Sequence, residues 1–135
     1  MTAKVVYTGE LRTLSTHIRS GSTIETDAPV DNKGKGERFS PTDLVAVALA
    51  TCIVTTMGIS AQGKDINIDG AECEVVKIML SEPRRIGEIQ IKIFMPSGRS
   101  YSDKDKQWLQ HVAETCPVAR SLHSDLKQTI SFVWQ

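Results

Sequence analysis

The stretch that decides the fold is Ser40–Gln62, which reads SPTDLVAVALATCIVTTMGISAQ. It begins like a helix, because Ser40 is a favoured N-cap, a proline follows at the first helical position, and Asp43 can close a capping box. No charged residue lies between Asp43 and Lys64, and Gly63 is placed to end the helix. A helix that is small or apolar on every face is expected to be buried, so the segment predicts the central helix of a core.

A membrane span is the alternative interpretation of this run, because its length is about right for crossing a bilayer. Four hydroxyl side chains dilute it, and neither basic residues nor an aromatic belt flank it in the way that anchors membrane helices. Its alanines and Gly58 suit close approach by a second helix or by sheet backbone. We therefore expect a core helix in a soluble protein and no membrane partner.

Length and composition restrict the class of protein. The chain has 135 residues, enough for one domain with a real core, and we expect a single domain over residues 1–135. Its formal net charge is zero, which argues against a general binder of nucleic acids or anionic membranes. Residues 1–7 lack an apolar signal region, and three widely spaced cysteines do not form a secreted disulfide framework. These features predict a cytoplasmic protein with reduced thiols.

The segments around the helix have strand patterns. Residues 4–27 predict an antiparallel meander, with a turn at 20–22, and residues 27–36 predict a loop. Residues 72–80 and 87–95 predict two further strands, and in the second Ile89, Ile91 and Ile93 alternate with polar side chains. Residues 128–133 predict the last strand.

A second helix is expected from the cap residue Ser102 to about Thr115, with Asp105 at the capping-box position. Pro117 cannot continue that helix without a kink but is well suited to begin a new one, so Cys116 should lie at a helix–helix junction. Strands, helix, strands, helices and strand together predict an α+β domain with helices packed on antiparallel sheet.

The three cysteines differ in the reactivity that their surroundings predict. Cys116 should lie at a helix N-terminus, where the dipole and free N–H groups favour a thiolate and Arg120 adds positive charge; the alternative is an unreactive cap. Cys52 is either a small core residue or a reactive thiol, and reactivity would need a cation or base, because burial alone raises a thiol's pKa. Cys73 lies between two glutamates, which disfavour a thiolate, so a structural role is expected.

The histidines are His17, His111 and His123, and none has the short spacing of a zinc site. We expect neither a metal nor a nucleotide cofactor, since no glycine-rich phosphate loop is present either. A cysteine–histidine hydrolase is a further alternative, although the sequence singles out no histidine for it.

With both cysteines located, the sequence resembles the OsmC/Ohr family of osmotically induced and organic hydroperoxide resistance proteins. Two motifs carry the resemblance: residues 39–44, FSPTDL, leading to Ala50-Thr51-Cys52, and Cys116-Pro117-Val118. The resemblance covers essentially the whole chain. It implies an intertwined homodimer in which antiparallel sheets from both chains wrap two central helices.

The resemblance also implies an activity, the reduction of organic hydroperoxides in an antioxidant stress response. Cys52 would be the peroxidatic thiolate that becomes a sulfenic acid, and Cys116 the resolving thiol that forms a disulfide with it. An apolar pocket beside Cys52 would suit a fatty or aromatic hydroperoxide. An external dithiol of the lipoamide or thioredoxin type would then reduce the disulfide.

One position departs from the family pattern. In the peroxidase branches a glutamate follows the proline and positions an arginine against the reactive cysteine, whereas here Thr42 follows and Asp43 comes one residue later. One helical step turns a side chain by about 100°, so Asp43 points in another direction than the family glutamate; it stays a candidate supporting residue, together with Arg38. The arginine candidates are Arg12, Arg19 and Arg38, with Arg38 nearest to the helix start and His17 as a polar substitute. The alternative function is an inert OsmC-like module that senses redox state or binds an apolar ligand.

Overall fold

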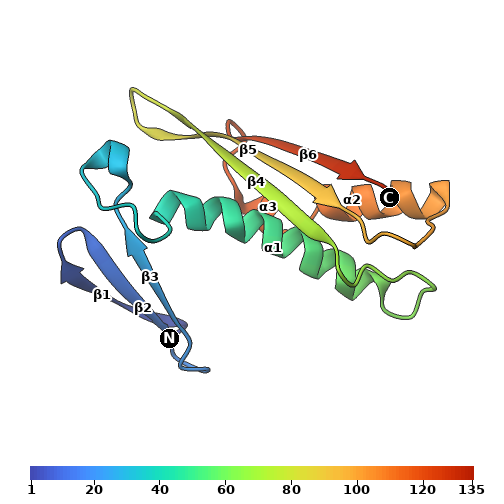
Figure 1. Ribbon diagram of the computed structural model, residues 1–135, viewed down its shortest axis with the longest axis horizontal. Helices are drawn as coiled ribbons and strands as arrows, with labels where there is room; N and C mark the ends of the chain where they lie inside the picture. The colour runs from blue at the N-terminus through green and yellow to red at the C-terminus, as the bar shows by residue number, and fades with distance from the viewer. The chain divides into compact units, whose positions relative to one another are not determined.

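The computed structural model describes all residues from Met1 to Gln135. The chain forms two compact units, an N-terminal unit (Met1–Val45) and a C-terminal unit (Ala46–Gln135). Helix α1 (Pro41–Ala61) begins in the first unit and continues through the second (Figure 1). The single domain expected from the sequence stays a prediction.

The N-terminal unit is built on a three-stranded antiparallel sheet in the order β1-β2-β3, which confirms the predicted meander. Its strands are β1 (Ala3–Gly9), β2 (Arg12–His17) and β3 (Thr23–Asp27). A single 3-10 turn, η1 (Val30–Asn32), lies in the loop that follows. The buried side chains of this unit are all polar: Thr26, Asp27 and Ser40. The unit therefore has no buried apolar core of its own.

The C-terminal unit contains the second sheet, in the order β4-β5-β6, with β4 (Glu72–Leu80), β5 (Arg85–Phe94) and β6 (Lys127–Val133). The prediction of wholly antiparallel sheet is wrong here, because β6 runs parallel to β5. The reason is the connection between them. It passes through α2 (Asp103–Glu114) and α3 (Pro117–Ser121), and a helical crossover of this length returns the chain in the same direction.

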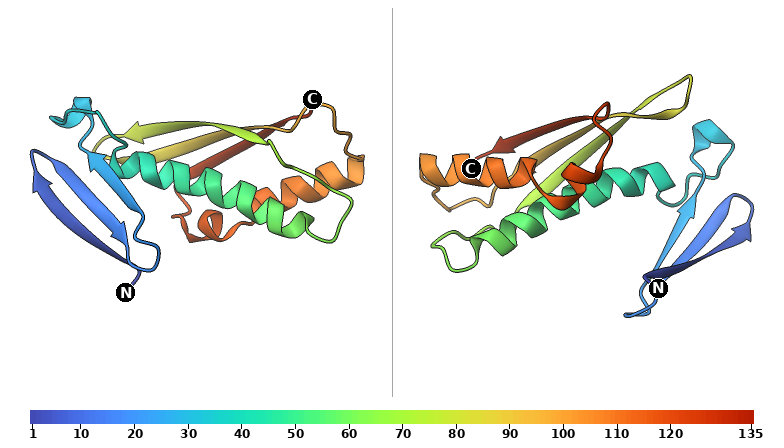
Figure 2. Two further views of the ribbon diagram at one scale, coloured as in Figure 1. Left: turned by 60° about the horizontal axis from the view of Figure 1, so that its bottom comes forward. Right: turned by 180° about the vertical axis from the view of Figure 1, so that it is seen from behind.

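The hydrophobic core lies between this sheet and the helices, which cover one of its faces (Figure 2). The predicted alternation in β5 is confirmed, since Ile89, Ile91 and Ile93 are fully buried while the next side chains along the strand are more exposed. These isoleucines belong to one core cluster with side chains from the helices, among them Leu49, Ile53, Met57, Leu109 and Ala113.

Helix α1 is a core helix, but the expectation that every face is buried is wrong for the chain by itself. Its buried residues recur at helical spacing and form one face: Ala46, Leu49, Ala50, Ile53, Met57 and Ala61. The opposite face is exposed and includes Val45, Ala48, Thr51, Thr55 and Ile59. The cause is geometric, because the sheet covers only one side of the helix. By length and composition alone the helix could cross a membrane, yet its buried face packs into the core of a soluble fold.

Both predicted capping boxes are confirmed. The Asp43 amide donates to Ser40 Oγ at 3.0 Å and the Ser40 amide donates to Asp43 Oδ2 at 2.8 Å. Ser102 and Asp105 make the same reciprocal pair at the start of α2. Each pair satisfies amide donors that the first helical turn leaves without partners.

Candidate active site

Two of the three cysteines are brought together in the C-terminal unit. Cys52 lies in the middle of α1 and is half-buried, whereas Cys116 is fully buried in the core cluster. The two thiols are neighbours in the core, close enough for Cys52 to raise the pKa of the Cys116 thiol. Cys116 is the N-cap of α3, at the helix junction that Pro117 predicts. Residues 64 positions apart in the sequence thus form one thiol pair, and all three cysteines are free.

The electrostatics of Cys116 differ from the prediction. Burial raises the pKa of the Cys116 thiol above its ordinary value, and the neighbouring Cys52 raises it further. The backbone N–H groups of Ala119 and Val118 act in the opposite direction and lower it; the Ala119 amide lies 3.4 Å from Cys116 Sγ. The expected effect of the helix N-terminus is present, but desolvation outweighs it because the thiol is fully buried. The expected help from Arg120 is not observed, since that side chain is exposed.

Cys52 has one polar neighbour on its own helix. Its Sγ lies 3.9 Å from Thr56 Oγ1, one helical turn further along. Helix geometry brings residues at i and i+4 to the same face, so this pair could have been found from the sequence spacing. A hydroxyl at this position can donate a hydrogen bond to a thiolate.

The arginine candidate with the most developed contacts is Arg12. Its Nε and one Nη donate to the two carboxylate oxygens of Asp27 at 2.6 and 2.8 Å, and the same Nη donates to Glu37 at 3.0 Å. The Asp27 side chain is 2% exposed. The hydrogen bond from Arg12 lowers the pKa of the Asp27 carboxyl against the opposing effect of its burial. This network is structural within the N-terminal unit, because it joins two strand ends to the loop before α1.

The other candidates also have local partners. Arg38, the nearest in sequence to α1, donates from Nε to Glu25 at 2.8 Å, and both side chains are substantially exposed. Arg19 is exposed, and His17 Nδ1 lies 2.6 Å from Ser20 Oγ. All of these residues lie in the N-terminal unit, whereas the thiol pair lies in the C-terminal unit. Activation of Cys52 by one of the arginines stays a prediction.

Thr42 and Asp43, where the sequence departs from the family pattern, both contact the capping residue of α1. Asp43 completes the box with Ser40, as expected from the sequence. Thr42 Oγ1 lies 3.1 Å from Ser40 Oγ, so this side chain also takes part in the helix start. A supporting role for Asp43 in catalysis stays a prediction.

The third cysteine lies in a strand, and the remaining potential metal ligands do not cluster. Cys73 is half-buried in β4, and burial raises its pKa, which agrees with the structural role expected for it. No group of three or more His, Cys, Asp and Glu side chains converges as a metal site would require.

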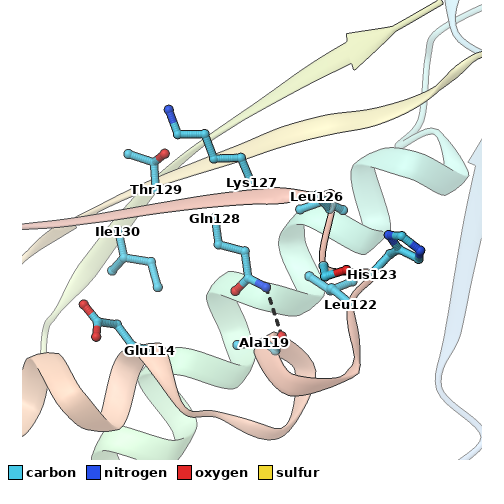
Figure 3. Close-up of a pocket in the computed structure, with 10 residues that line it drawn as sticks. Glu114, Ala119, Leu122, His123, Leu126, Lys127, Gln128, Thr129 and Ile130 are labelled. Carbon is cyan, nitrogen blue, oxygen red and sulfur yellow. Dashed lines mark hydrogen bonds between the residues drawn. The ribbon is translucent and has the colours of Figure 1, made fainter.

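A cavity of about 640 Å³ lies in the C-terminal unit between α3 and β6 (Figure 3). Neither cysteine of the pair lines it, so it is not the apolar pocket expected beside Cys52. One polar contact joins its two sides, because Gln128 Nε2 donates to the Ala119 carbonyl at 2.9 Å. Sequence reasoning missed Gln128 and the Arg12–Asp27 pair, since each contact links segments whose proximity no spacing rule predicts.

Comparisons with known proteins agree with this arrangement. The OsmC family profile, described as OsmC-like protein, matches residues 34–131, which include both cysteines. No curated protein matches the chain. A crystal structure of a candidate osmotic stress induced and detoxification response protein from Psychrobacter arcticus is 46% identical, with a TM-score of 0.93, over 98% of this chain and 96% of that chain.

More distant structures share the fold. An organic hydroperoxide resistance protein OsmC from Legionella pneumophila is 14% identical, with a TM-score of 0.76, over 98% of this chain and 96% of that one. The organic hydroperoxide resistance protein OhrB of Bacillus subtilis is 19% identical, with a TM-score of 0.68, over 98% of both chains.

Proposed function

The chain belongs to the OsmC-like family, and on that premise we propose that it reduces organic hydroperoxides through Cys52 and Cys116. The observation that carries the proposal is the placement of both thiols in one core cluster, where Cys52 raises the pKa of Cys116; one is half-buried on a core helix and the other is buried at a helix N-cap. Two distant structures of the same fold are named organic hydroperoxide resistance proteins, which supports this substrate class.

The chemistry has two steps. The Cys52 thiolate attacks the distal oxygen of ROOH, the O–O bond breaks, the alkoxide takes up a proton and leaves as ROH, and Cys52 becomes a sulfenic acid. Cys116 then attacks the sulfenic sulfur and forms a disulfide, while its thiol proton and the sulfenic hydroxyl leave as water. An external dithiol, of the lipoamide or thioredoxin type, then reduces the Cys52–Cys116 disulfide by thiol–disulfide exchange, so that both cysteines return to thiols and the dithiol becomes a disulfide. The setting we propose for this cycle is the cytoplasm.

The roles of the thiols follow from their surroundings. Cys52 is the more accessible of the two and has the Thr56 hydroxyl at 3.9 Å, so it is the better attacking group. Burial raises the pKa of Cys116, which favours the neutral thiol over the thiolate. A buried neutral thiol is protected from the oxidant until a sulfenic acid forms beside it.

A titration of the reduced protein with cumene hydroperoxide tests the proposal. We expect the loss of two thiols per chain and a Cys52–Cys116 disulfide in peptide mass spectra. Cys52→Ser should abolish peroxide consumption, Cys116→Ser should stop at the sulfenic acid, and Cys73→Ser should behave as wild type. Survival of both thiols in a modest excess of peroxide would exclude the mechanism.

We also propose that the protein is a homodimer. The uncovered face of α1 carries Ile59, which is 62% exposed, and the N-terminal sheet exposes Val5 and Tyr7 at 63% and 64%. Apolar surfaces of this extent favour a protein interface. Sedimentation should give twice the chain mass of 14.9 kDa, and Ile59→Asp should yield monomers, whereas the control Gln107→Asp on α2 should not. A monomeric wild-type protein would exclude the dimer.

A second candidate function is an inert module that senses redox state or binds an apolar ligand. The observation that favours it is Thr42, which takes the position of the family glutamate. Its hydroxyl forms a hydrogen bond with the Ser40 hydroxyl at the start of α1. In this case purified protein should leave cumene hydroperoxide unreduced while an apolar fluorescent probe still binds.

A further inference from the structure

The contacts of α3 connect Cys116 to a residue outside the thiol pair. Helix α3 has only five residues, Pro117–Ser121, and a helix this short is not stable without tertiary contacts. The cavity of about 640 Å³ lies along its β6 side and opens to solvent. Gln128 of β6 reaches α3 by the hydrogen bond from Nε2 to the Ala119 carbonyl (Figure 3).

Both backbone polar groups of Ala119, the carbonyl and the amide, make hydrogen bonds to side chains. Its carbonyl accepts from Gln128 at 2.9 Å, and its amide donates to Cys116 Sγ at 3.4 Å. Ala119 and Cys116 are both buried, and the hydrogen bond from Gln128 is part-buried beside the cavity, so loss of either contact leaves a backbone group of Ala119 without its protein partner. The orientation of α3 therefore determines where the Cys116 sulfur points and how far it is shielded.

We propose that Gln128 is a positioning residue that holds α3, and with it Cys116, in place for disulfide formation with Cys52. The inference rests on the proposed function, since it concerns its second step. Cys116 must attack the sulfenic sulfur of Cys52 before another hydroperoxide does. A second ROOH would transfer an oxygen to the sulfenic acid, giving a sulfinic acid and ROH, and this product cannot form the disulfide. Firm placement of Cys116 favours the disulfide.

Two substitutions remove the donor and keep the length of the side chain. Gln128→Met is uncharged and flexible enough to remain beside the cavity. Gln128→Glu has the same shape but no N–H donor at neutral pH. The matched control is Gln107→Met, because Gln107 is an exposed glutamine on α2.

The first measurement requires no peroxidase activity. In a Cys52→Ser, Cys73→Ser background, native Cys116 is alkylated with iodoacetamide over a range of pH. Loss of the Gln128 hydrogen bond should raise the rate about two- to tenfold, the population change expected from one such bond. The pH midpoint should move down, because an opened α3 hydrates the thiol. Rates and midpoints equal to those of Gln107→Met would overturn the proposal, as would an effect seen with Gln128→Glu alone.

The second measurement follows the reaction itself. In the three-cysteine protein, the initial rate of cumene hydroperoxide consumption should be unchanged by Gln128→Met. The ratio of Cys52 sulfinic acid to Cys52–Cys116 disulfide should rise by the same two- to tenfold factor. A proportional fall in both steps would indicate general damage and overturn a positioning role. If the wild-type protein consumes no peroxide, the proposed function fails while the alkylation result still decides the placement of Cys116.

Discussion

The two units of this chain are stabilised by different means. All buried apolar side chains lie in the C-terminal unit, where α1 and β5 provide most of them. The N-terminal unit buries Asp27 and Thr26 instead, and it is joined by the Arg12–Asp27–Glu37 network. The difference indicates that the second unit can fold around its own core, while the first depends on polar contacts and on surfaces beyond its own strands.

The largest expected effect is on the free energy of unfolding, when a leucine is replaced by alanine at one position in each unit. Leu49→Ala removes a fully buried side chain from the C-terminal core and should lower the free energy of unfolding by about 2–5 kcal/mol. Leu11→Ala, at a side chain that is 45% exposed in the N-terminal unit, should change it by less than about 0.5 kcal/mol. Urea denaturation at low protein concentration measures both. Equal losses would mean that the first unit has an apolar core after all.

The next prediction removes the polar support of the N-terminal unit. Arg12→Met leaves the buried Asp27 carboxylate without its bidentate partner, so the pKa of Asp27 should rise. Amide hydrogen exchange should become faster at Glu37, whose N–H donates to Asp27 at 3.1 Å, and should stay unchanged in β5. The control is Arg38→Met, because its ion pair with Glu25 is exposed and contributes little. Faster exchange in β5 would show that the units do not respond separately.

Sequence patterns predicted the parts of this fold that depend on local chemistry. The capping serines, Gly63 with its positive φ of 76°, and the alternating isoleucines of β5 each specify a local conformation, and the structure confirms them. The parallel pairing of β6 was missed, because strand direction depends on how a long crossover packs and not on the pattern of the strand itself. The thiol pair followed from the family resemblance, whereas Gln128 had no local signal.

A smaller effect is expected at the helix caps, one of which lies in each unit. Ser40→Ala and Ser102→Ala each remove a hydroxyl that accepts an amide hydrogen bond three residues on, which should cost about 1 kcal/mol of stability. Ser40 is 1% exposed whereas Ser102 is exposed, so the loss at Ser40 should be the greater. Thermal unfolding compares them, with Ser100→Ala as an exposed control. A larger loss at Ser102 would contradict the argument from burial.

The smallest expected effect concerns how the stability of each unit depends on pH, through one carboxyl group in each. Asp27 has a pKa below its ordinary value, chiefly through the hydrogen bond from Arg12, so the folded state binds its proton less readily than the unfolded state. Its contribution to stability is therefore complete above the unfolded value of about 3.9 and is lost as pH falls through the lower folded value. In the C-terminal unit the pKa of Glu88 is also lowered, chiefly by the hydrogen bond from the Thr129 hydroxyl. A carboxyl NMR titration should give a depressed midpoint at both residues, and Arg12→Met should remove the depression at Asp27 alone. Because the ion-pair partners of Arg12 are Asp27 and Glu37, both in the N-terminal unit, a simultaneous change at Glu88 would mean that the charge network reaches beyond that unit.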